Sequence, residues 1–345
     1  MRIGLVCPYD MGVPGGVQDQ VTRLARWLRA EGHAVKVVGP GHCDLPGFVS
    51  LGPTTVIPAN GAKTPVALAR GVGNAVLAAL ADVDVAHVHE PLMPQVSLAV
   101  LRRATVPLVG TFHSDVSRVG AGIYRLGKPL TSRWFKRLNV MTAVSSVAAR
   151  VVEYTGRVRI IPNGIDVADY APAAKRADSV IFLGRNDERK GLHVLLEAWP
   201  LIRAAQPEAT LTVVGADPVG PPRSGVTFVG RVSEAEKIAH LAAASICCAP
   251  NLSGESFGIV LAEAMAAGCA VVASALPGFV SVAGDAARLV APGDADGLAG
   301  AVIALLDTPN DIGALGKAAR LRVQRFDGSV VAAAYLGAYE DALAG

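Results

Sequence analysis

Short apolar, β-branched runs alternate along the chain with longer stretches in which apolar residues recur every three to four positions. The short runs have the length of buried strands, and Gln18–Glu31, which Gly32 ends, is typical of the helices between them. This alternation predicts parallel α/β sheets. The predicted strands are Ile3–Cys7, Ala34–Gly39, Val83–His89, Leu108–Phe112, Val140–Val144, Arg159–Ile161, Val180–Gly184, Thr210–Gly215, Val226–Val229, Ser245–Ala249, Ala270–Ser274 and Arg288–Val290.

The apolar periodicity lapses over Asp166–Ser179, where Ala, Pro, Lys and Asp predominate. The sequence therefore predicts an α/β protein of two Rossmann-like, doubly wound domains, residues 1–168 and 169–326. A C-terminal helix in residues 327–345 is expected to pack back on the N-terminal domain. Such folds bind ligands beyond the carboxyl ends of their strands, so we expect the two domains to face a shared cleft.

One uncharged stretch, Ala264–Gly284, has to be weighed as a membrane span. Gly268 and Pro277 interrupt it, and it changes from Ala-rich to β-branched at residues 270–272. These features favour a buried helix, a turn and a buried strand. The opening segment Met1–Pro8 is interpreted as a first strand and not as a targeting peptide.

Composition narrows the class of protein. The 345 residues include 32 Lys and Arg against 29 Asp and Glu, and 51% are hydrophobic. These values exclude a disordered chain and argue against a dedicated nucleic-acid binder. The charge is uneven, because residues 1–168 hold 18 Lys and Arg against 10 acids, and residues 169–345 hold 14 against 19. We therefore expect the N-terminal domain to face an anionic partner. The five cysteines include no C-x-x-C pair, which suits a reducing cytoplasm.

A glycine turn follows the first predicted strand, at Val13-Pro14-Gly15-Gly16-Val17. Two glycines between a strand and a helix let backbone N–H groups approach an anion, although such a pair is as often an ordinary tight turn. No G-x-G-x-x-G follows a strand, which argues against an NAD-linked oxidoreductase.

Two loops of the second domain carry denser chemistry. Arg185 and Lys190 follow a strand end, where they can neutralise a diphosphate, although a basic loop is more often a solvated surface. In Asn251–Gly268, Glu255 lies in a loop and Glu263 lies within an apolar helix, where a carboxylate needs a partner such as ribose hydroxyls. The amides of residues 256–258 begin that helix and form a second anion site. Together these groups suit a nucleotide sugar.

These elements resemble the family 4 retaining glycosyltransferases of the GT-B fold over nearly the whole chain. Within that family, the chain is similar to bacterial members that transfer mannose from GDP-mannose to phosphatidylinositol at the inner membrane face. The segments that carry the resemblance are Cys7–Tyr9, Val13–Gln18, His87–Pro91, Thr111–His113, Ile161–Gly164 and Gly254–Ala267.

The resemblance implies roles at matching positions. Arg185 and Lys190 would hold the diphosphate and stabilise charge on the leaving nucleotide, Glu263 would bind the ribose, and His113 and Glu255 would contact the transferred sugar. The implied catalytic residues are His113, Arg185, Lys190 and Glu255. The implied donor-binding residues are Gly15, Gly16, Arg185, Lys190, Glu255, Ser256, Phe257, Gly258 and Glu263. The implied acceptor-binding residues are Tyr9, Asp10, His89, Glu90, His113 and Ser114.

No metal is expected. His87 and His89 point the same way on one strand, but no third ligand accompanies them at a telling spacing. Asp82-Val83-Asp84 and Asp294-Ala295-Asp296 are similar to the D-x-D of metal-dependent transferases, whereas GT-B enzymes generally use side-chain cations instead. The resemblance therefore implies a nucleotide sugar as substrate and no required cofactor, with Mg²⁺ not indicated by the sequence.

The chain departs from its lipid-specific relatives near the acceptor. Where they carry a basic amphipathic helix, Thr64–Ala81 has Arg70 as its one cation, and Gly12 replaces an acidic residue. A substitute is the span between Asp115 and Glu153, which contains no acid and suits either an anionic bilayer or a core-packed helix pair. Its basic and aromatic residues are Arg118, Tyr124, Arg125, Lys128, Arg133, Trp134, Phe135, Lys136, Arg137 and Arg150.

The expected function is a retaining transfer of mannose from GDP-mannose to a phosphatidylinositol-type lipid by a peripheral enzyme at the inner membrane face. No carboxylate stands out as a covalent nucleophile, which favours attack on the face that the leaving group departs. Inositol phosphate, a polyprenyl-linked saccharide or a UDP-sugar are alternative substrates. A non-catalytic nucleotide-sugar-binding membrane partner is the alternative of another class, and no nucleic acid is expected.

Overall fold

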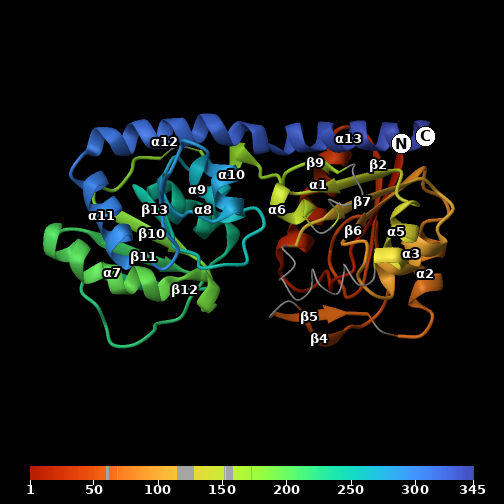
Figure 1. Ribbon diagram of the computed structural model, residues 1–345, viewed down its shortest axis with the longest axis horizontal. Coiled ribbons are helices and arrows are strands. Elements are labelled where there is room, and N and C mark those ends of the chain that lie inside the picture. The colour runs from red at the N-terminus through yellow and green to blue at the C-terminus, as the bar shows by residue number, and fades with distance from the viewer. Residues whose placement is uncertain (60–61, 68, 115–127, 151, 153–157, 172) are drawn as a thin grey trace. The chain divides into compact units, whose positions relative to one another are not determined.

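The computed structural model describes residues 1–59, 62–67, 69–114, 128–150, 152, 158–171 and 173–345, which form two compact units (Figure 1). Unit 1 comprises Met1–Gly164 and Gly328–Gly345, and unit 2 comprises Ile165–Asp327. The division falls a few residues before the expected one, because Ile165 already bridges to Asp327 and Tyr170 is buried. The predicted linker is therefore largely part of unit 2.

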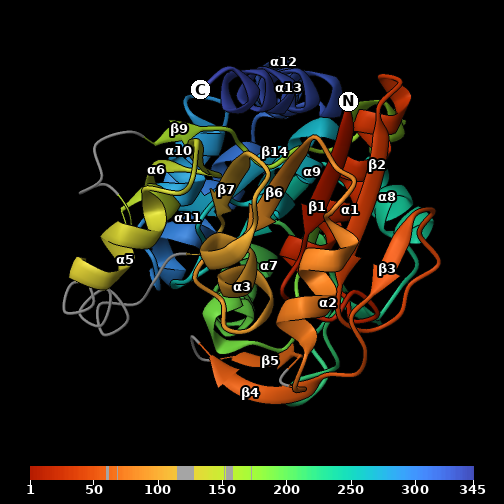
Figure 2. The ribbon, with the colours of Figure 1, turned by 90° about the vertical axis from the view of Figure 1, so that its right-hand side faces the viewer.

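Unit 1 is built on a parallel seven-stranded sheet with the order β3-β2-β1-β6-β7-β8-β9. Helices α1 and α13 cover one face, with α1 on β2 and α13 on β6, β7 and β8, whereas α2 contacts β2, α3 contacts β6 and the two pack against each other (Figure 2). Its elements are β1 (Arg2–Val6), α1 (Gly16–Ala30), β2 (Ala34–Gly39), β3 (Phe48–Ser50), β4 (Thr55–Ala59), β5 (Ala62–Val66), α2 (Val72–Ala79), β6 (Val85–His89), α3 (Val96–Arg103), β7 (Leu108–Phe112), α5 (Lys128–Phe135), β8 (Val140–Ala143), α6 (Ser146–Ala149), β9 (Arg159–Ile160) and α13 (Gly328–Ala344).

Unit 2 is built on a parallel six-stranded sheet with the order β12-β11-β10-β13-β14-β15. Helices α7 and α11 close its main apolar core. Its elements are η2 (Val167–Asp169), β10 (Ser179–Leu183), η3 (Glu188–Lys190), α7 (Leu192–Ala205), β11 (Thr210–Val214), β12 (Val226–Gly230), α8 (Glu234–Ala243), β13 (Ile246–Ala249), α9 (Ile259–Ala266), β14 (Ala270–Ser274), α10 (Pro277–Ala283), β15 (Arg288–Val290), α11 (Ala295–Leu306), α12 (Pro309–Val323) and η4 (Gln324–Phe326).

All twelve predicted strands are present, within about two residues at their ends. The apolar pattern misses β3 and the β4–β5 hairpin. Pro58 and Pro65 lie within that hairpin, and proline argues against a strand because it donates no ladder hydrogen bond. The hairpin is an antiparallel pair outside the main sheet, where such residues are tolerated.

The uncharged stretch Ala264–Gly284 contains the end of α9, then β14 and α10, as expected for a buried segment. Within the described residues no single helix has both the length and the apolarity of a membrane span. The α11 helix and the α12–η4 segment satisfy these criteria only as a pair, and they meet at a bend of 103°.

Candidate functional site

In unit 2, the loops that follow β10 and β13 leave neighbouring strands at the point where the strand order reverses, which is where parallel α/β sheets bind ligands. The two loops are joined by a hydrogen bond from the amide of Leu252 to the carbonyl of Arg189, at 2.8 Å. Gly191 has a φ of +68°, and a Cβ there would lie 1.9 Å from the carbonyl oxygen of Pro250. Glycine is therefore needed for this close approach.

The structure brings Lys190 and Glu255 together as an ion pair between these loops. Their side chains are 24% and 17% exposed. Asn251, which the sequence reasoning missed, donates from Nδ2 to the same carboxylate at 2.8 Å. Arg185 is exposed at the end of β10. A ligand can therefore replace one partner of this ion pair: a phosphate can bind Lys190, and a sugar hydroxyl can bind Glu255.

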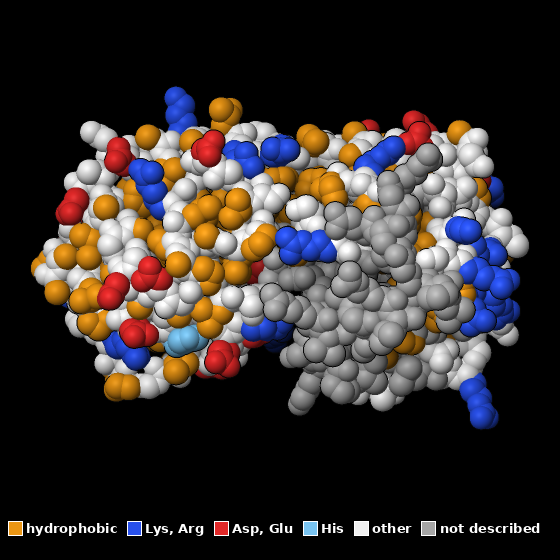
Figure 3. Space-filling view, in the orientation of Figure 1, with side chains coloured by type: hydrophobic (Ala, Val, Ile, Leu, Met, Phe, Trp, Pro, Cys, Tyr) orange, Lys and Arg blue, Asp and Glu red, His pale blue; other side chains and the backbone are white. Residues whose placement is uncertain are grey.

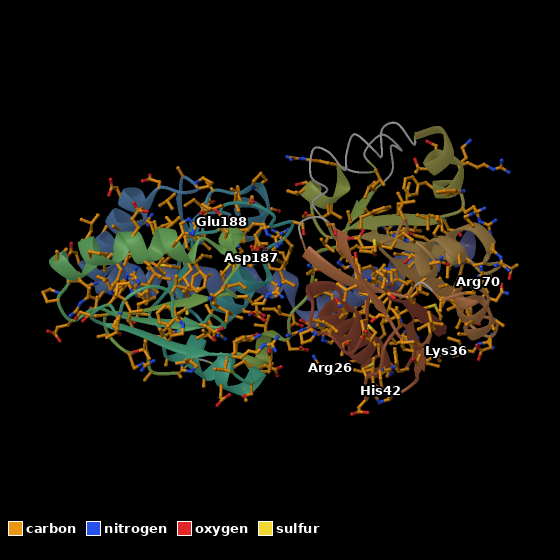
Figure 4. All side chains as sticks on the ribbon, turned by 90° about the horizontal axis from the view of Figure 1, so that it is seen from below. Arg26, Lys36, His42, Arg70, Asp187 and Glu188 are labelled. Atoms are coloured by element: carbon orange, nitrogen blue, oxygen red, sulfur yellow. The ribbon has the colours of Figure 1, made fainter. Side chains whose placement is uncertain are left out.

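The third cation of the first loop, Arg189, belongs to the loop itself. Asp187 caps η3 by accepting from the Arg189 amide at 3.0 Å, and its other oxygen lies 2.6 Å from the Arg189 guanidinium. This hydrogen-bonded guanidinium lowers the pKa of Asp187 to about 2. Figure 4 shows Asp187 and Glu188 on this turn. Arg189 is thus committed to the loop, and the cations that can meet a ligand are the exposed Arg185 and Lys190 of the Lys190–Glu255 pair.

The buried carboxylate of Glu263 has a protein partner that the sequence did not reveal. Glu263 lies on α9 and is 4% exposed, and Lys237 of α8 places its Nζ 2.7 Å from Oε1. Burial by itself would lower the pKa of Lys237, but the carboxylates of Glu263 and Glu234 outweigh it and raise that pKa. A capping box, Ser233 with Glu236, begins α8 and so positions Lys237.

At the start of α9, packing holds the residues whose amides are predicted to bind a phosphate. The ring of Phe257 is buried and packs edge-on against Phe326, with ring centres 5.3 Å apart. Gly258 has a φ of +112°, and a Cβ there would lie 2.7 Å from the Phe279 ring. The amides of residues 256–258 therefore precede the helix in a conformation that glycine permits, and their contact with a phosphate stays a prediction.

In unit 1, four predicted residues come together where β6 and β7 end. One oxygen of Glu90, Oε1, accepts from the amides of His113 and Ser114 and from the Ser114 hydroxyl, at 3.0, 2.8 and 2.7 Å. His89 and His113 are hydrogen-bonded through Nδ1 and Nε2, at 2.8 Å. Glu90 thus holds the backbone that carries His113, with its own φ at +47°.

Burial dominates the electrostatics of these groups. It raises the pKa of Glu90, although the three hydrogen bonds to its carboxylate oppose the shift. It lowers the pKa of His113 to about 3, against an opposing contribution from Asn163, and it lowers that of His89 well below its usual range. Both rings are therefore neutral near pH 7.

His87 also lies on this face of the sheet but is bonded to Thr111 and Tyr339, at 2.6 and 2.9 Å. Within the described part of the chain, no group of three or more His, Cys, Asp or Glu side chains is arranged to hold a metal ion. Asp82 and Asp84 pair instead with Lys36 and Arg2.

The residues predicted at the end of β1 lie around a compact loop. Asp10 accepts from the Gly12 amide at 2.9 Å and from the Thr54 hydroxyl at 2.5 Å, and Tyr9 bridges to Val66. Gly15 is the N-cap of α1, and the space beside Gly16 is open, because a Cβ there would meet no atom within 4 Å. That Tyr9 and Asp10 bind the acceptor and that Gly15 and Gly16 bind the donor stays a prediction.

Exposed Lys and Arg side chains gather on one edge of unit 1 (Figure 3), and Figure 4 shows Arg70 at the same end of the unit. Phe135 is buried in the core, whereas the Arg102 guanidinium lies 5.5 Å from the half-exposed Trp134 ring. Arg118, Tyr124, Arg125 and the side chain of Lys128 lie outside the described residues. We call the exposed group the basic edge, which consists of Arg102, Arg103, Arg133, Lys136 and Arg137.

Two family models match the chain: Glycosyltransferase Family 4 over residues 14–169, and Glycosyl transferases group 1 over residues 177–308. The phosphatidyl-myo-inositol mannosyltransferase of Mycolicibacterium smegmatis is 41% identical and covers 99% of this chain and 94% of its own length. The enzyme of that name from Propionibacterium freudenreichii is 36% identical, covering 90% and 88%.

Solved structures support the fold. Sucrose-phosphate synthase from Thermosynechococcus elongatus has a TM-score of 0.76 at 22% identity and covers 99% of both chains. Anabaena HepE in complex with UDP has a TM-score of 0.77 at 20% identity and covers 99% of this chain and all of its own. These likenesses confirm the predicted pair of Rossmann-like domains.

Proposed function

The chain belongs to the family 4 glycosyltransferases, with phosphatidyl-myo-inositol mannosyltransferases among its full-length relatives, and from this premise we propose that it transfers mannose from GDP-mannose to a phosphatidylinositol-type lipid. It is a glycosyltransferase of the GT-B fold. The observation that carries the proposal is the Lys190–Glu255 pair, held at the switch point of a chain that matches these relatives over nearly its whole length.

The side chains of unit 2 suit the donor. A nucleotide sugar presents a diphosphate, a ribose diol and sugar hydroxyls. Lys190 and the exposed Arg185 bind the diphosphate, and Glu255 accepts hydrogen bonds from the sugar. Glu263 accepts from the ribose hydroxyls while Lys237 neutralises its charge.

The transfer proceeds with retention. As the bond from the anomeric carbon to the phosphate oxygen breaks, negative charge grows on the diphosphate, and Lys190 and Arg185 stabilise it. The acceptor hydroxyl attacks on the same face and gives its proton to the leaving phosphate oxygen. Glu255 is engaged by Lys190 and Asn251, which suits a hydrogen-bond acceptor better than a covalent nucleophile.

The side chains of unit 1 suit the acceptor. Tyr9, Asp10 and the β6 and β7 ends bind the polar head group, and His113 contacts the transferred sugar. Glu90 supports this role because it fixes the backbone of both His113 and Ser114. A neutral imidazole in a buried site can donate or accept a hydrogen bond without adding charge to the reaction centre.

We also propose that the basic edge contacts an anionic membrane surface, with the enzyme peripheral on the cytoplasmic face. Each exposed cation near such a surface adds about 1 kcal/mol, and Trp134 suits the interface. The double charge reversal Arg102→Glu with Arg103→Glu should weaken binding to phosphatidylinositol-containing vesicles in a sedimentation assay. Lys317→Glu with Arg325→Glu, exposed cations of unit 2, is the matched control. Equal losses in both variants would contradict the assignment.

The decisive experiment is a donor-by-acceptor matrix read by mass spectrometry. Donors are GDP-mannose and UDP-sugars, and acceptors are phosphatidylinositol vesicles, inositol phosphate and a polyprenyl-linked saccharide. We expect a single mannose added to phosphatidylinositol from GDP-mannose, with the α-anomeric configuration of the donor kept. Transfer from a UDP-sugar alone, or to a soluble acceptor alone, would replace the proposed substrates while leaving the family assignment intact.

A further inference from the structure

A chain of hydrogen bonds crosses the interior of unit 1 from helix α13 to the sheet. The Tyr339 hydroxyl lies 2.9 Å from His87 Nδ1, and His87 Nε2 lies 2.6 Å from the Thr111 hydroxyl. Thr111 is 2.5 Å from the Thr142 hydroxyl, which donates to the carbonyl of Gly110 at 3.2 Å. The four hydrogen-bonded side chains are all fully buried.

The direction of each bond in this chain can be worked out from its end. The Gly110 carbonyl can only accept, so the Thr142 hydroxyl donates its one proton there. Thr142 must then accept from the Thr111 hydroxyl. Thr111 then has no proton left for His87, so it accepts from His87 Nε2–H. His87 is therefore the Nε2–H tautomer, and its Nδ1 accepts from the Tyr339 hydroxyl.

A second pair of rings lies against this fixed one. The His87 and His89 rings are stacked with centres 4.1 Å apart, and His89 Nδ1 lies 2.8 Å from His113 Nε2. His89 Nε2 and His113 Nδ1 are buried and make no well-formed hydrogen bond among the described residues, although the Asn163 side chain interacts with the His113 ring and raises its pKa. A neutral pair can share only one proton between the bonded nitrogens. The two rings must therefore adopt the same tautomer, both Nδ1–H or both Nε2–H.

Burial distinguishes these two states. The Nε2–H state would leave an N–H group without a partner on His89, which is 1% exposed. The Nδ1–H state places the open N–H on His113, which is 6% exposed and lies where the strand ends, and leaves His89 with only an unfilled acceptor. An orphaned buried donor is rarer than an orphaned acceptor, which favours the Nδ1–H state.

We propose that His89 is a positioning residue for the transfer: it donates from Nδ1 to His113 Nε2 and so fixes on His113 an Nδ1–H group that donates to an oxygen of the sugar. The proposal rests on the proposed function, in which His113 contacts that sugar. Glu90 fixes the backbone of His113, and His89 fixes its ring and its proton. Neither residue has to touch the substrate for this effect.

The first test needs no substrate. Long-range ¹H–¹⁵N correlation spectra of the uniformly labelled protein distinguish the two tautomers of each histidine ring. We expect Nε2–H for His87 and Nδ1–H for both His89 and His113. Unlike tautomers on His89 and His113, or Nε2–H on both, would overturn the proposal.

The second test separates positioning from folding. In H89L the Nδ1 donor is lost, and we expect kcat to fall by about 10–100-fold while the affinity for GDP, measured by calorimetry, changes less than about threefold. H89N retains an amide near the Nδ1 position and should recover much of this loss. Val109→Ala, a fully buried change on β7 that removes no hydrogen-bonding side chain, controls for lowered stability.

These outcomes separate the two proposals. An H89L enzyme with unchanged kcat, or an H89N enzyme no better than H89L, would overturn the positioning role while the wild type still transfers mannose. A wild type that transfers no sugar to any acceptor would overturn the proposed function, and the ring spectra would still decide how His89 and His113 share their proton.

Discussion

The two units reach functional chemistry by opposite physical routes. In unit 1 the candidate groups at the β6 and β7 ends are buried, with the neutral rings of His89 and His113 1% and 6% exposed and the Glu90 carboxylate held by backbone amides. In unit 2 they are charges on loops, such as Lys190 and Glu255, 24% and 17% exposed. Packing therefore presets the geometry of unit 1, whereas the charges of unit 2 are partnered with each other until a ligand exchanges with them.

The role of the charged loops in unit 2 is tested most strongly by substitution of Lys190. Lys190→Ala should reduce turnover by about 10²–10³-fold, because the charge that grows on the leaving group loses its cation. Steady-state kinetics with a saturating acceptor measures this. Lys317→Ala, an exposed cation of the same unit, is the control. Turnover within about threefold of the wild type would remove Lys190 from the leaving-group role.

The two units should also differ in how much stability they lose as the pH falls. The unfolded histidines take up protons below their ordinary pKa near 6.5, whereas burial keeps His87 and His113 neutral in the folded state until pH is near 3. The unfolded state therefore binds more protons in this window, and stability falls as pH falls. We expect a loss of about 1 kcal/mol for each buried histidine between pH 7 and 5.5.

Hydrogen exchange read by mass spectrometry can assign this loss to a unit. Peptides of unit 1 should lose protection between pH 7 and 5.5, after correction for intrinsic exchange, more than peptides of unit 2, whose His193 and His240 are not buried. The raised pKa of Glu90 acts in the opposite sense, so the comparison stays above pH 5.5. Equal losses in both units would show that the histidines do not set the acid response.

The smallest expected effect concerns the buried carboxylate of unit 2. Glu263→Gln should weaken nucleotide affinity by about tenfold, because an amide is a poorer acceptor for the ribose hydroxyls than a carboxylate. Calorimetric titration with GDP measures this. The variant also leaves Lys237 with Glu234 as its one remaining carboxylate among the ion pairs of the described residues, so Lys237→Met is the matched comparison. A fall in Tm in both variants with unchanged affinity in each would indicate that the pair is purely structural.

The order of elements could be predicted from the sequence because parallel strands are short, apolar and separated by helices. Leu108–Phe112 and Ala270–Ser274 have their predicted bounds. The β4–β5 hairpin could not be predicted, since its prolines oppose the local pattern. Local signals thus identify the sheets and fail where an element lies outside them.

The sequence could predict the parts of the candidate site that lie within one loop, but not the contacts between distant elements. Residues adjacent in a motif, such as Glu255 and its neighbours, are visible in the sequence as a group. The partner of Glu263 is Lys237, on another helix, and the partner of His87 is Tyr339, 252 residues away. Such pairs depend on the packed fold, so no spacing along the chain could indicate them.

Helix α13 gives the chain an unusual order of assembly. It follows unit 2 in the sequence, yet it supplies Val331, Tyr335 and Tyr339 to the core of unit 1. During synthesis from the N-terminus, unit 2 emerges as one continuous segment and can fold on the ribosome. Unit 1 must wait with the part of its sheet that α13 covers, on β6, β7 and β8 and including His87, exposed until α13 arrives. The unit that is synthesised first is therefore the one that matures last.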